Sequence, residues 1–155
     1  MIAADHLKRI ALWASGLSER EIEVARAGMT ERAYAANEFI CMRGDHLEYW
    51  MGVVTGLVRI GTGSRDGKAV SFTGMTNGAW FGEGTVLKNE ARRYDAVALR
   101  DTRLALMDRA TFFWLFENSV AFNRFLVGLL NERLGQFMGL VEYGRMLDAK
   151  ARLAR

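Results

Sequence analysis

The middle of the chain is a series of short segments rich in β-branched and aromatic residues, and this pattern constrains the fold most strongly. Proline is absent, so the chain must reverse direction at glycine, asparagine and aspartate, and the pairs Asp66-Gly67 and Asn77-Gly78 predict two such turns. Short strands at close spacing are typical of a β-sandwich or barrel. The expected strands are Glu38 to Met42, Tyr49 to Thr55, Leu57 to Thr62, Ala69 to Thr73, Tyr94 to Leu99 and Arg103 to Met107.

Helical patterns flank these strands on both sides. Residues 5–15 carry apolar side chains at helical spacing, and Ser18 followed by Glu21 predicts a capping box for a second helix that ends near Gly28. After the last strand we expect a short helix over 111–118 and then a long helix over 120–155. The sequence therefore predicts a mainly β fold with flanking helices.

The long helix carries an apolar seam. Its members alternate by three and four positions, as the a and d positions of a coiled coil do: Val127, Leu130, Leu134, Phe137, Val141 and Gly144. Glycines inside a helix cost up to about 1 kcal/mol each relative to alanine, and close approach of a second helix would offset that cost, for which Gly135 and Gly139 lie on one face. The seam predicts a homodimer; the alternative is that it packs on the barrel of its own chain.

Composition limits the class of protein. Half of the 155 residues are hydrophobic, which suits one domain with a real core, and the net charge of +3 comes from scattered residues that do not by themselves indicate nucleic-acid binding. Charges interrupt residues 1–18, so no signal peptide is expected, and no segment approaches the roughly 20 apolar residues of a membrane span. The single cysteine, Cys41, excludes an internal disulfide, fits a reducing cytoplasm and is expected to be buried in a strand.

Four motifs in order resemble the effector domain of the Crp/Fnr family of bacterial transcription regulators. They are "GDHLEYWMGVVTGLVRI", "WFGEGTVL", "ARRYDAVALRDTRLALM" and the long helix that ends near "MLDAKARLAR". The resemblance implies a double-stranded β-helix (jelly-roll) barrel like that of cyclic-nucleotide-binding domains over residues 1–119, followed by a dimerisation helix over 120–155. It also implies a DNA-binding helix-turn-helix domain after Asp148, which is absent from this chain, so we expect the chain to be part of a longer regulator and DNA to be a partner of that regulator.

The segment from Gly82 to Arg93 has the residues that an anion site needs. Gly82 and Gly84 allow the backbone to approach a ligand, and an arginine offers a planar fork to two phosphate oxygens. Glu83 suits a sugar hydroxyl better than a phosphate, because a carboxylate only accepts hydrogen bonds. The resemblance implies that Gly82 and Glu83 match the family's ribose-binding pair and that Arg92 matches the arginine that contacts the cyclic phosphate.

Four positions depart from the family pattern. Arg93 and Tyr94 stand where nucleotide-binding relatives carry Ser or Thr and then Ala, and Phe137 and Met138 stand where relatives that bind cyclic AMP carry a hydroxyl pair that touches the adenine. These differences argue against cyclic AMP itself. Three hypotheses stay open: a nucleotide or other phosphate-bearing effector, a different small effector, and a dimerisation scaffold without effector in which Arg93 pairs with Glu83 or Asp95.

Other kinds of site find little support in the sequence. His6 and His46 are the only histidines, too few and too far apart for a cupin metal site, and no cysteine cluster or identifiable axial ligand supports an iron-sulfur or haem sensor. No nucleophile motif is present, so we expect no enzyme. The four tryptophans, with the phenylalanines, are expected in the core. The sequence thus predicts an allosteric effector-sensing domain.

Overall fold

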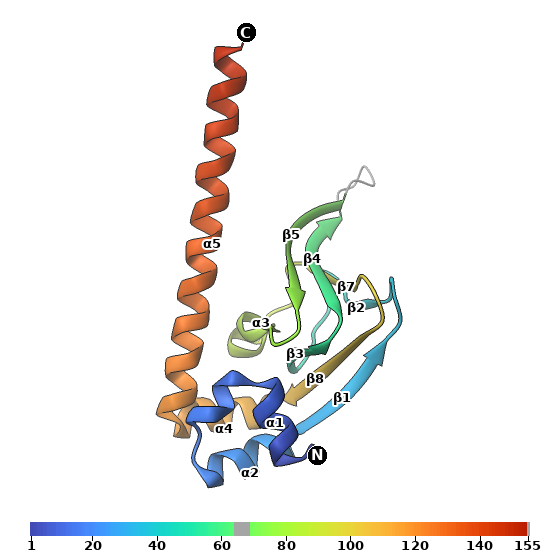
Figure 1. The fold of residues 1–155 in the computed structure, drawn as a ribbon, viewed down its shortest axis with the longest axis vertical. Coiled ribbons are helices and arrows are strands. Elements are labelled where there is room, and N and C mark those ends of the chain that lie inside the picture. The colour runs from blue at the N-terminus through green and yellow to red at the C-terminus, as the bar shows by residue number, and fades with distance from the viewer. Residues whose placement is uncertain (64–68, 155) are drawn as a thin grey trace.

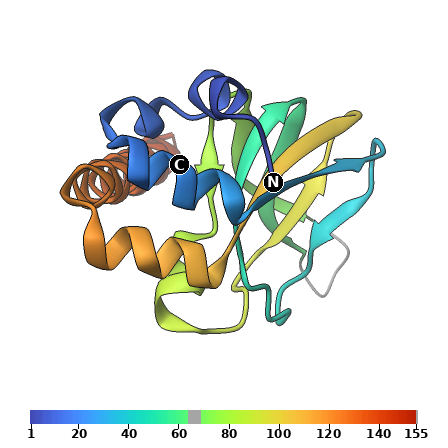
Figure 2. The same ribbon diagram turned by 90° about the horizontal axis from the view of Figure 1, so that it is seen from below.

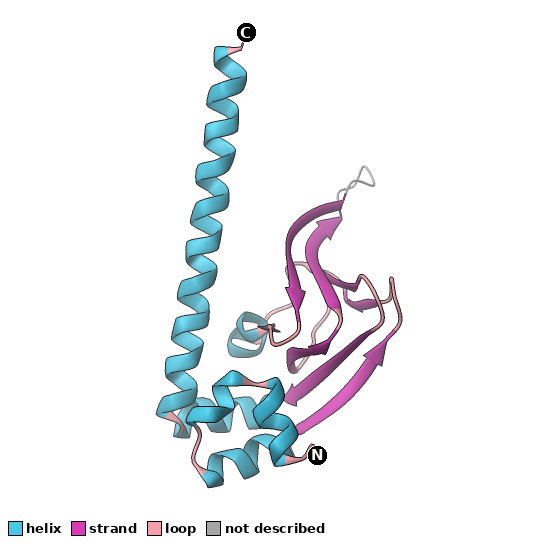
Figure 3. Cartoon of the chain, in the orientation of Figure 1, coloured by secondary structure: helices cyan, strands magenta, loops and turns pink. Residues whose placement is uncertain are grey.

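The computed structural model describes residues 1–63 and 69–154, and these form two antiparallel sheets beside a group of helices (Figure 1, Figure 3). One four-stranded sheet has the order β1-β8-β3-β6 and the other the order β2-β7-β4-β5. The strands are β1 (Met29–Tyr34), β2 (Phe39–Cys41), β3 (Tyr49–Thr55), β4 (Leu57–Gly63), β5 (Ala69–Thr76), β6 (Trp80–Phe81), β7 (Asp95–Ala98) and β8 (Thr102–Asp108). The predicted β-rich fold with flanking helices is confirmed.

The helices gather on one side of the sheets, around the start of the last helix (Figure 2). They are α1 (Ala4–Ile10), the 3₁₀ helix η1 (Leu12–Gly16), α2 (Glu19–Ala27), α3 (Glu83–Lys88), α4 (Arg109–Asn118) and α5 (Val120–Leu153). The predicted capping box is present, since the Ser18 hydroxyl accepts from the Glu21 N–H (3.2 Å) and the Glu21 carboxylate from the Ser18 N–H (2.9 Å). Ser119 caps α5 by accepting from the Phe122 N–H (3.1 Å).

Two hydrophobic cores fill the molecule. One lies between the helices and β3 and contains three of the four tryptophans, as expected, and the other lies between the two sheets and contains Cys41. Only the first part of α5 joins the first core, through buried Phe122 and Leu126. The rest of α5 extends past the sheets (Figure 1). None of the helices in the described ranges is long and apolar enough to cross a membrane.

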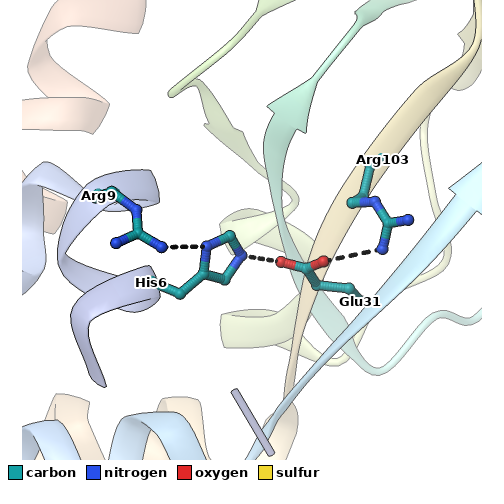
Figure 4. A network of polar contacts seen from close by, with 4 residues as sticks. All are labelled: His6, Arg9, Glu31 and Arg103. Carbon is teal, nitrogen blue, oxygen red and sulfur yellow. Dashed lines mark hydrogen bonds and ion pairs between the residues drawn. The ribbon is translucent and has the colours of Figure 1, made fainter. Parts of the chain in front are cut away.

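A polar network ties the first helix to the sheet (Figure 4). Glu31 on β1 pairs with His6 of α1 and with Arg103 of β8, the latter at 3.1 Å, while Arg9 donates to the other ring nitrogen of His6 (3.5 Å). Burial by itself would raise the pKa of Glu31, but the hydrogen bonds from His6 and Arg103 outweigh it and leave the pKa below its usual value.

Several elements differ from the sequence prediction. The local pattern does not predict strand β1, because half of its side chains are polar; it forms because all six residues pair with β8, from Met29↔Met107 to Tyr34↔Thr102. The helix expected over 5–15 breaks at Ala11, whose backbone is extended. The segment from Glu83, expected as a loop, forms α3. The predicted Asp66-Gly67 turn lies outside the described residues, although β4 and β5 on its two sides pair antiparallel.

Candidate functional site

The site begins at Gly82, between β6 and α3. Gly82 has φ +97°, in the left-handed region that favours glycine, and a Cβ atom built on it would lie 2.8 Å from both terminal nitrogens of Arg92. The guanidinium of Arg92 therefore packs directly against the backbone of Gly82. Any side chain at this position would both strain the backbone and displace the arginine.

Glu83, the first residue of α3, is buried with only 2% of its surface exposed. Its Oε1 atom accepts from Arg133 of α5, and its Oε2 atom accepts from the indole N–H of Trp50 at 3.4 Å. Arg133 also donates to the backbone carbonyl of Trp80. The carboxylate thus connects the end of β6 to the long helix, and protein donors engage both of its oxygens.

Arg92 is 1% exposed, which is exceptional for an arginine. Its backbone is held by the loop before β3: the Arg92 N–H donates to the Asp45 carbonyl and the Gly44 N–H to the Arg92 carbonyl, both at 2.8 Å. Its side chain donates from Nη2 to the Tyr49 carbonyl (3.4 Å), while Nε and Nη1 are buried without a hydrogen-bond partner in the described part of the chain.

Buried guanidinium donors without acceptors are costly, because they lose water and gain no hydrogen bond in exchange. The oxygens of a phosphate or carboxylate group are strong acceptors for such guanidinium donors. The unpaired donors of Arg92, held against the backbone of Gly82, are therefore chemically suited to a small anion.

Arg93, next to Arg92, lies on the surface. Its side chain is 78% exposed and pairs with Glu90 at 3.3 Å. The pairings of Arg93 with Glu83 or Asp95 that the scaffold hypothesis required are wrong: Glu83 pairs with Arg133, and Asp95 accepts from the backbone N–H of Arg43 at 2.6 Å. One arginine of the adjacent pair therefore turns inward and its neighbour outward.

Tyr94 is partly buried and packs against the core between the sheets. Burial raises the pKa of its phenol, nearby Arg92 opposes this rise and Glu83 adds to it, so the ring lies close to both charges and stays neutral. Together with Arg93 and Gly84 it lines a shallow pocket beside Lys88 and Glu90. Six of the eight predicted ligand residues thus form two groups. Gly82, Glu83 and Arg92 lie in the buried cluster, and Gly84, Arg93 and Tyr94 line this outer pocket.

Phe137 and Met138 are not part of the buried cluster. They lie on the extended part of α5, and their side chains are 63% and 61% exposed. The seam residues are equally uncovered in the single chain, so the alternative that the seam packs on its own barrel is wrong; they are Val127, Leu130, Leu134, Phe137, Val141 and Gly144.

The structure offers no support for other chemistry at the positions that it describes. Within the described residues no three His, Cys, Asp or Glu side chains come together as metal ligands. Cys41 lies in β2 and is buried, as predicted, and burial raises the pKa of its thiol even though Arg92 opposes that rise. A buried thiol with a raised pKa is a poor nucleophile.

Sequence reasoning missed two residues of the site. The sequence pattern gives Arg133 no role beyond a charge outside the apolar seam, yet it bonds Glu83 from 50 positions away. Trp50 had been assigned to the core alone, although its N–H reaches the same carboxylate. The one sequence feature that could have indicated Arg133 is its position on the long helix, outside the apolar seam. No local pattern indicates a role for Trp50 at the site.

The family model of the cyclic nucleotide-binding domain matches residues 31–119, which is more than half of the chain. The chain belongs to this family. The matched range contains Gly82, Glu83 and Arg92, whereas Arg133, which bonds Glu83, lies beyond it on α5. No curated protein matches the sequence.

Solved structures support the same assignment. The catabolite activator protein of Thermus thermophilus is 25% identical with a TM-score of 0.72, over 84% of this chain and 61% of its own. A cyclic nucleotide-binding domain from Methylobacillus flagellatus is 20% identical with a TM-score of 0.71, over 88% of this chain and 81% of its own. The regulatory domain of Toxoplasma gondii PKA, crystallised with cAMP, is 23% identical with a TM-score of 0.63, over 70% of this chain and 42% of its own.

These similarities confirm the jelly-roll fold and the resemblance to Crp-like effector domains. The fold is that of a regulatory cyclic nucleotide-binding domain, as in the catabolite activator protein and the PKA regulatory subunit. This chain spans about three fifths of the length of the Thermus protein.

Proposed function

We propose that this cyclic nucleotide-binding domain senses a nucleotide-like or other small anionic effector and dimerises, as part of a Crp/Fnr-type transcription regulator. The observation that carries the proposal is Arg92, whose buried Nε and Nη1 atoms have no partner in the described structure and which lies against Gly82. The phosphate or carboxylate group of an effector would supply an acceptor for these buried donors.

Glu83 gives the proposed site its link to α5. A sugar hydroxyl that bonds to Glu83 would compete with Arg133 for the same carboxylate, and so effector binding would change the attachment of α5 to the barrel. A ligand shifts a conformational equilibrium only through different contacts in the two states, and this exchange of partners is such a difference. The shift in α5 would then control DNA binding by a domain beyond this chain.

Dimerisation is proposed through the extended part of α5. Its apolar side chains repeat at coiled-coil spacing and are exposed in one chain, and Gly135 and Gly139 have no atom within 4 Å where a Cβ would stand. A second copy of the helix would cover both features. Sedimentation at high micromolar concentration should give a dimer for the wild type and a monomer for Leu134→Glu, while a wild-type monomer would contradict the proposal.

The protein is proposed to act in the cytoplasm and to have no catalytic activity. Its proposed partners are a second copy of the chain and, through the parent regulator, DNA; a membrane is not among them. Cyclic AMP is proposed to be a less suitable effector than another nucleotide. Arg93 and Tyr94 stand where nucleotide-binding relatives carry a small hydroxyl residue and alanine, and Phe137 and Met138 stand where relatives that bind cyclic AMP carry the hydroxyl pair that touches adenine.

Calorimetric titration with cyclic AMP, cyclic GMP and cyclic di-GMP tests effector binding. We expect at least one of them to bind, with Arg92→Ala weakening its affinity by about tenfold to a hundredfold, since hydrogen bonds to charged groups are worth roughly 1.5–3 kcal/mol. Arg93→Ala is the matched control, because Arg93 is adjacent but exposed and paired only with Glu90. An equal loss of affinity in both variants would mean that the positive charge of the loop, and not a specific contact of Arg92 with the phosphate, causes the effect.

The second candidate function is a dimerisation scaffold that has lost effector binding. It is favoured by the burial of Glu83 and Arg92 and by the protein donors on both Glu83 oxygens, which leave the pair closed to solvent. Silence across the nucleotide panel, together with a stable dimer, would support the scaffold and overturn the sensor.

A further inference from the structure

Three tryptophans pack together next to Glu83. The Trp50 and Trp80 rings lie with centroids 4.5 Å apart, and Trp13 from η1 contacts both at 5.4 and 5.3 Å. All three indole groups are buried, but only the N–H of Trp50 has an acceptor among the described residues, and that acceptor is Oε2 of Glu83. The N–H groups of Trp13 and Trp80 are buried without a partner there.

The two donors to Glu83 differ in how freely they can move. Trp50 belongs to β3 and is fully buried. Its ring makes edge-to-face contacts with Phe112 and Phe122, whose ring centroids lie 5.5 and 5.4 Å from its own. The side chain of Arg133 retains 27% of its exposure and comes from the part of α5 whose large apolar side chains are exposed. The indole is therefore the fixed partner of the carboxylate and the guanidinium the exchangeable one.

We propose that Trp50 is a positioning residue for effector binding. Its N–H holds Oε2 of Glu83, and this fixes the carboxylate so that Oε1 is the atom presented to Arg133 or to a hydroxyl of the effector. The inference rests on the proposed function and deepens it, because it assigns the orientation of the hydroxyl-accepting group to a residue in the core.

The first arm of the test needs no effector. In ¹⁵N-labelled full chain, the indole N–H resonances of the tryptophans are assigned by single Trp→Phe changes and compared between wild type and Glu83→Gln. A hydrogen bond to a carboxylate is stronger than one to a neutral amide. We expect the Trp50 resonance to move upfield, with much smaller shifts for Trp13 and Trp80. Equal shifts for all three, or none for Trp50, would overturn the positioning role.

The second arm asks whether Trp50 acts through the hydroxyl-accepting carboxylate. The probes are cyclic AMP and cyclic GMP, each compared with its 2′-deoxy form. We expect Trp50→Phe to weaken the ribose form by about fivefold to tenfold and to leave the deoxy form nearly unchanged, since only the first uses the oriented carboxylate.

Trp80→Phe is the matched control for this second arm. Trp80 is buried in the same cluster and stacks on Trp50, but its N–H has no partner in the described structure, so its loss removes ring volume without a hydrogen bond. Equal weakening of ribose and deoxy forms, or the same selectivity in Trp80→Phe, would contradict the inference. Failure of every nucleotide to bind would instead overturn the proposed function, while the indole resonances would still report whether Trp50 holds Glu83.

Discussion

Both parts of α5 carry large apolar side chains, but the surroundings of these side chains differ. In the first part, Phe122 and Leu126 are buried in the helical core, and Phe125 and Leu129 pack against it. Beyond Leu130 the large apolar side chains are exposed, while Arg133 bonds Glu83 and the Trp80 carbonyl. The first part thus anchors the helix to the domain, and the second presents an exposed apolar surface and one polar connection to the candidate site.

We expect the largest difference between the two parts of α5 when the unfolding free energies of Phe122→Ala and Phe137→Ala are compared. Phe122 is fully buried and meets Trp13, Trp50 and Phe112 edge-on at 5.4–5.5 Å, so its truncation should cost about 3–5 kcal/mol of unfolding free energy. Phe137→Ala should change that free energy by less than about 0.5 kcal/mol when the protein is dilute enough to be monomeric. Urea unfolding measures both, and similar losses would mean that the second part is also held within one chain.

A smaller effect is expected at the site itself, in Gly82→Ala. The left-handed backbone and the 2.8 Å approach to Arg92 should together cost about 1–3 kcal/mol of unfolding free energy. Gly84→Ala is the control, because Gly84 lies in α3 with no atom within 4 Å of its added Cβ, and alanine there should be neutral or slightly stabilising. If the two variants unfolded alike in urea, the contact between Gly82 and Arg92 would not be needed for stability.

Gly135→Ala and Gly139→Ala test what covers the second part of α5. Neither added methyl meets an atom within one chain, so each should strengthen the monomeric helix by up to about 1 kcal/mol, which amide hydrogen exchange of α5 would detect. In the proposed dimer the same methyls should separate the helices and weaken self-association, as measured by sedimentation. Stronger self-association would place the glycines away from the interface.

The smallest effect concerns the attachment of α1 to the sheet. Because His6 and Arg103 hold the pKa of Glu31 below its ordinary value of 4.5, Glu31 contributes stability that is fully present above that pH and is lost as pH falls through its lowered pKa. At pH 7 we expect Glu31→Gln to unfold with about 0.5–1 kcal/mol less free energy than wild type. The two unfolding free energies should converge as the pH falls through the lowered pKa of Glu31; a difference that stays constant over this range would show that the charge of Glu31 does not cause it.

Local sequence patterns predicted most of the secondary structure for identifiable reasons. The capping box at Ser18 involves atoms three residues apart, and the glycine at Gly78 permits the positive φ of +86° that its turn requires. Strand β1 could not be predicted in this way. Its adjacent charged residues Glu31 and Arg32 give little local indication of a strand, and the pairing of all six residues with β8 compensates for them.

The candidate site also has one part that the sequence predicts and one part that it does not. The order of Gly82, Glu83 and Arg92 in the chain was sufficient to suggest an anion site, because those residue types have few other uses in that arrangement. Which of the two adjacent arginines turns inward was not open to prediction from composition or spacing, since both have the same chemistry and differ only in what packs around them.

By itself the sequence determined the β-rich fold with flanking helices, the apolar seam of the long helix and the cassette from Gly82 to Arg92, because each depends on neighbouring residues or on a regular period. Only the tertiary structure decided that Glu83 is held by Trp50 and Arg133, which lie 33 and 50 positions away. Contacts at that separation depend on how the sheets and helices pack, and no local pattern of residues specifies them.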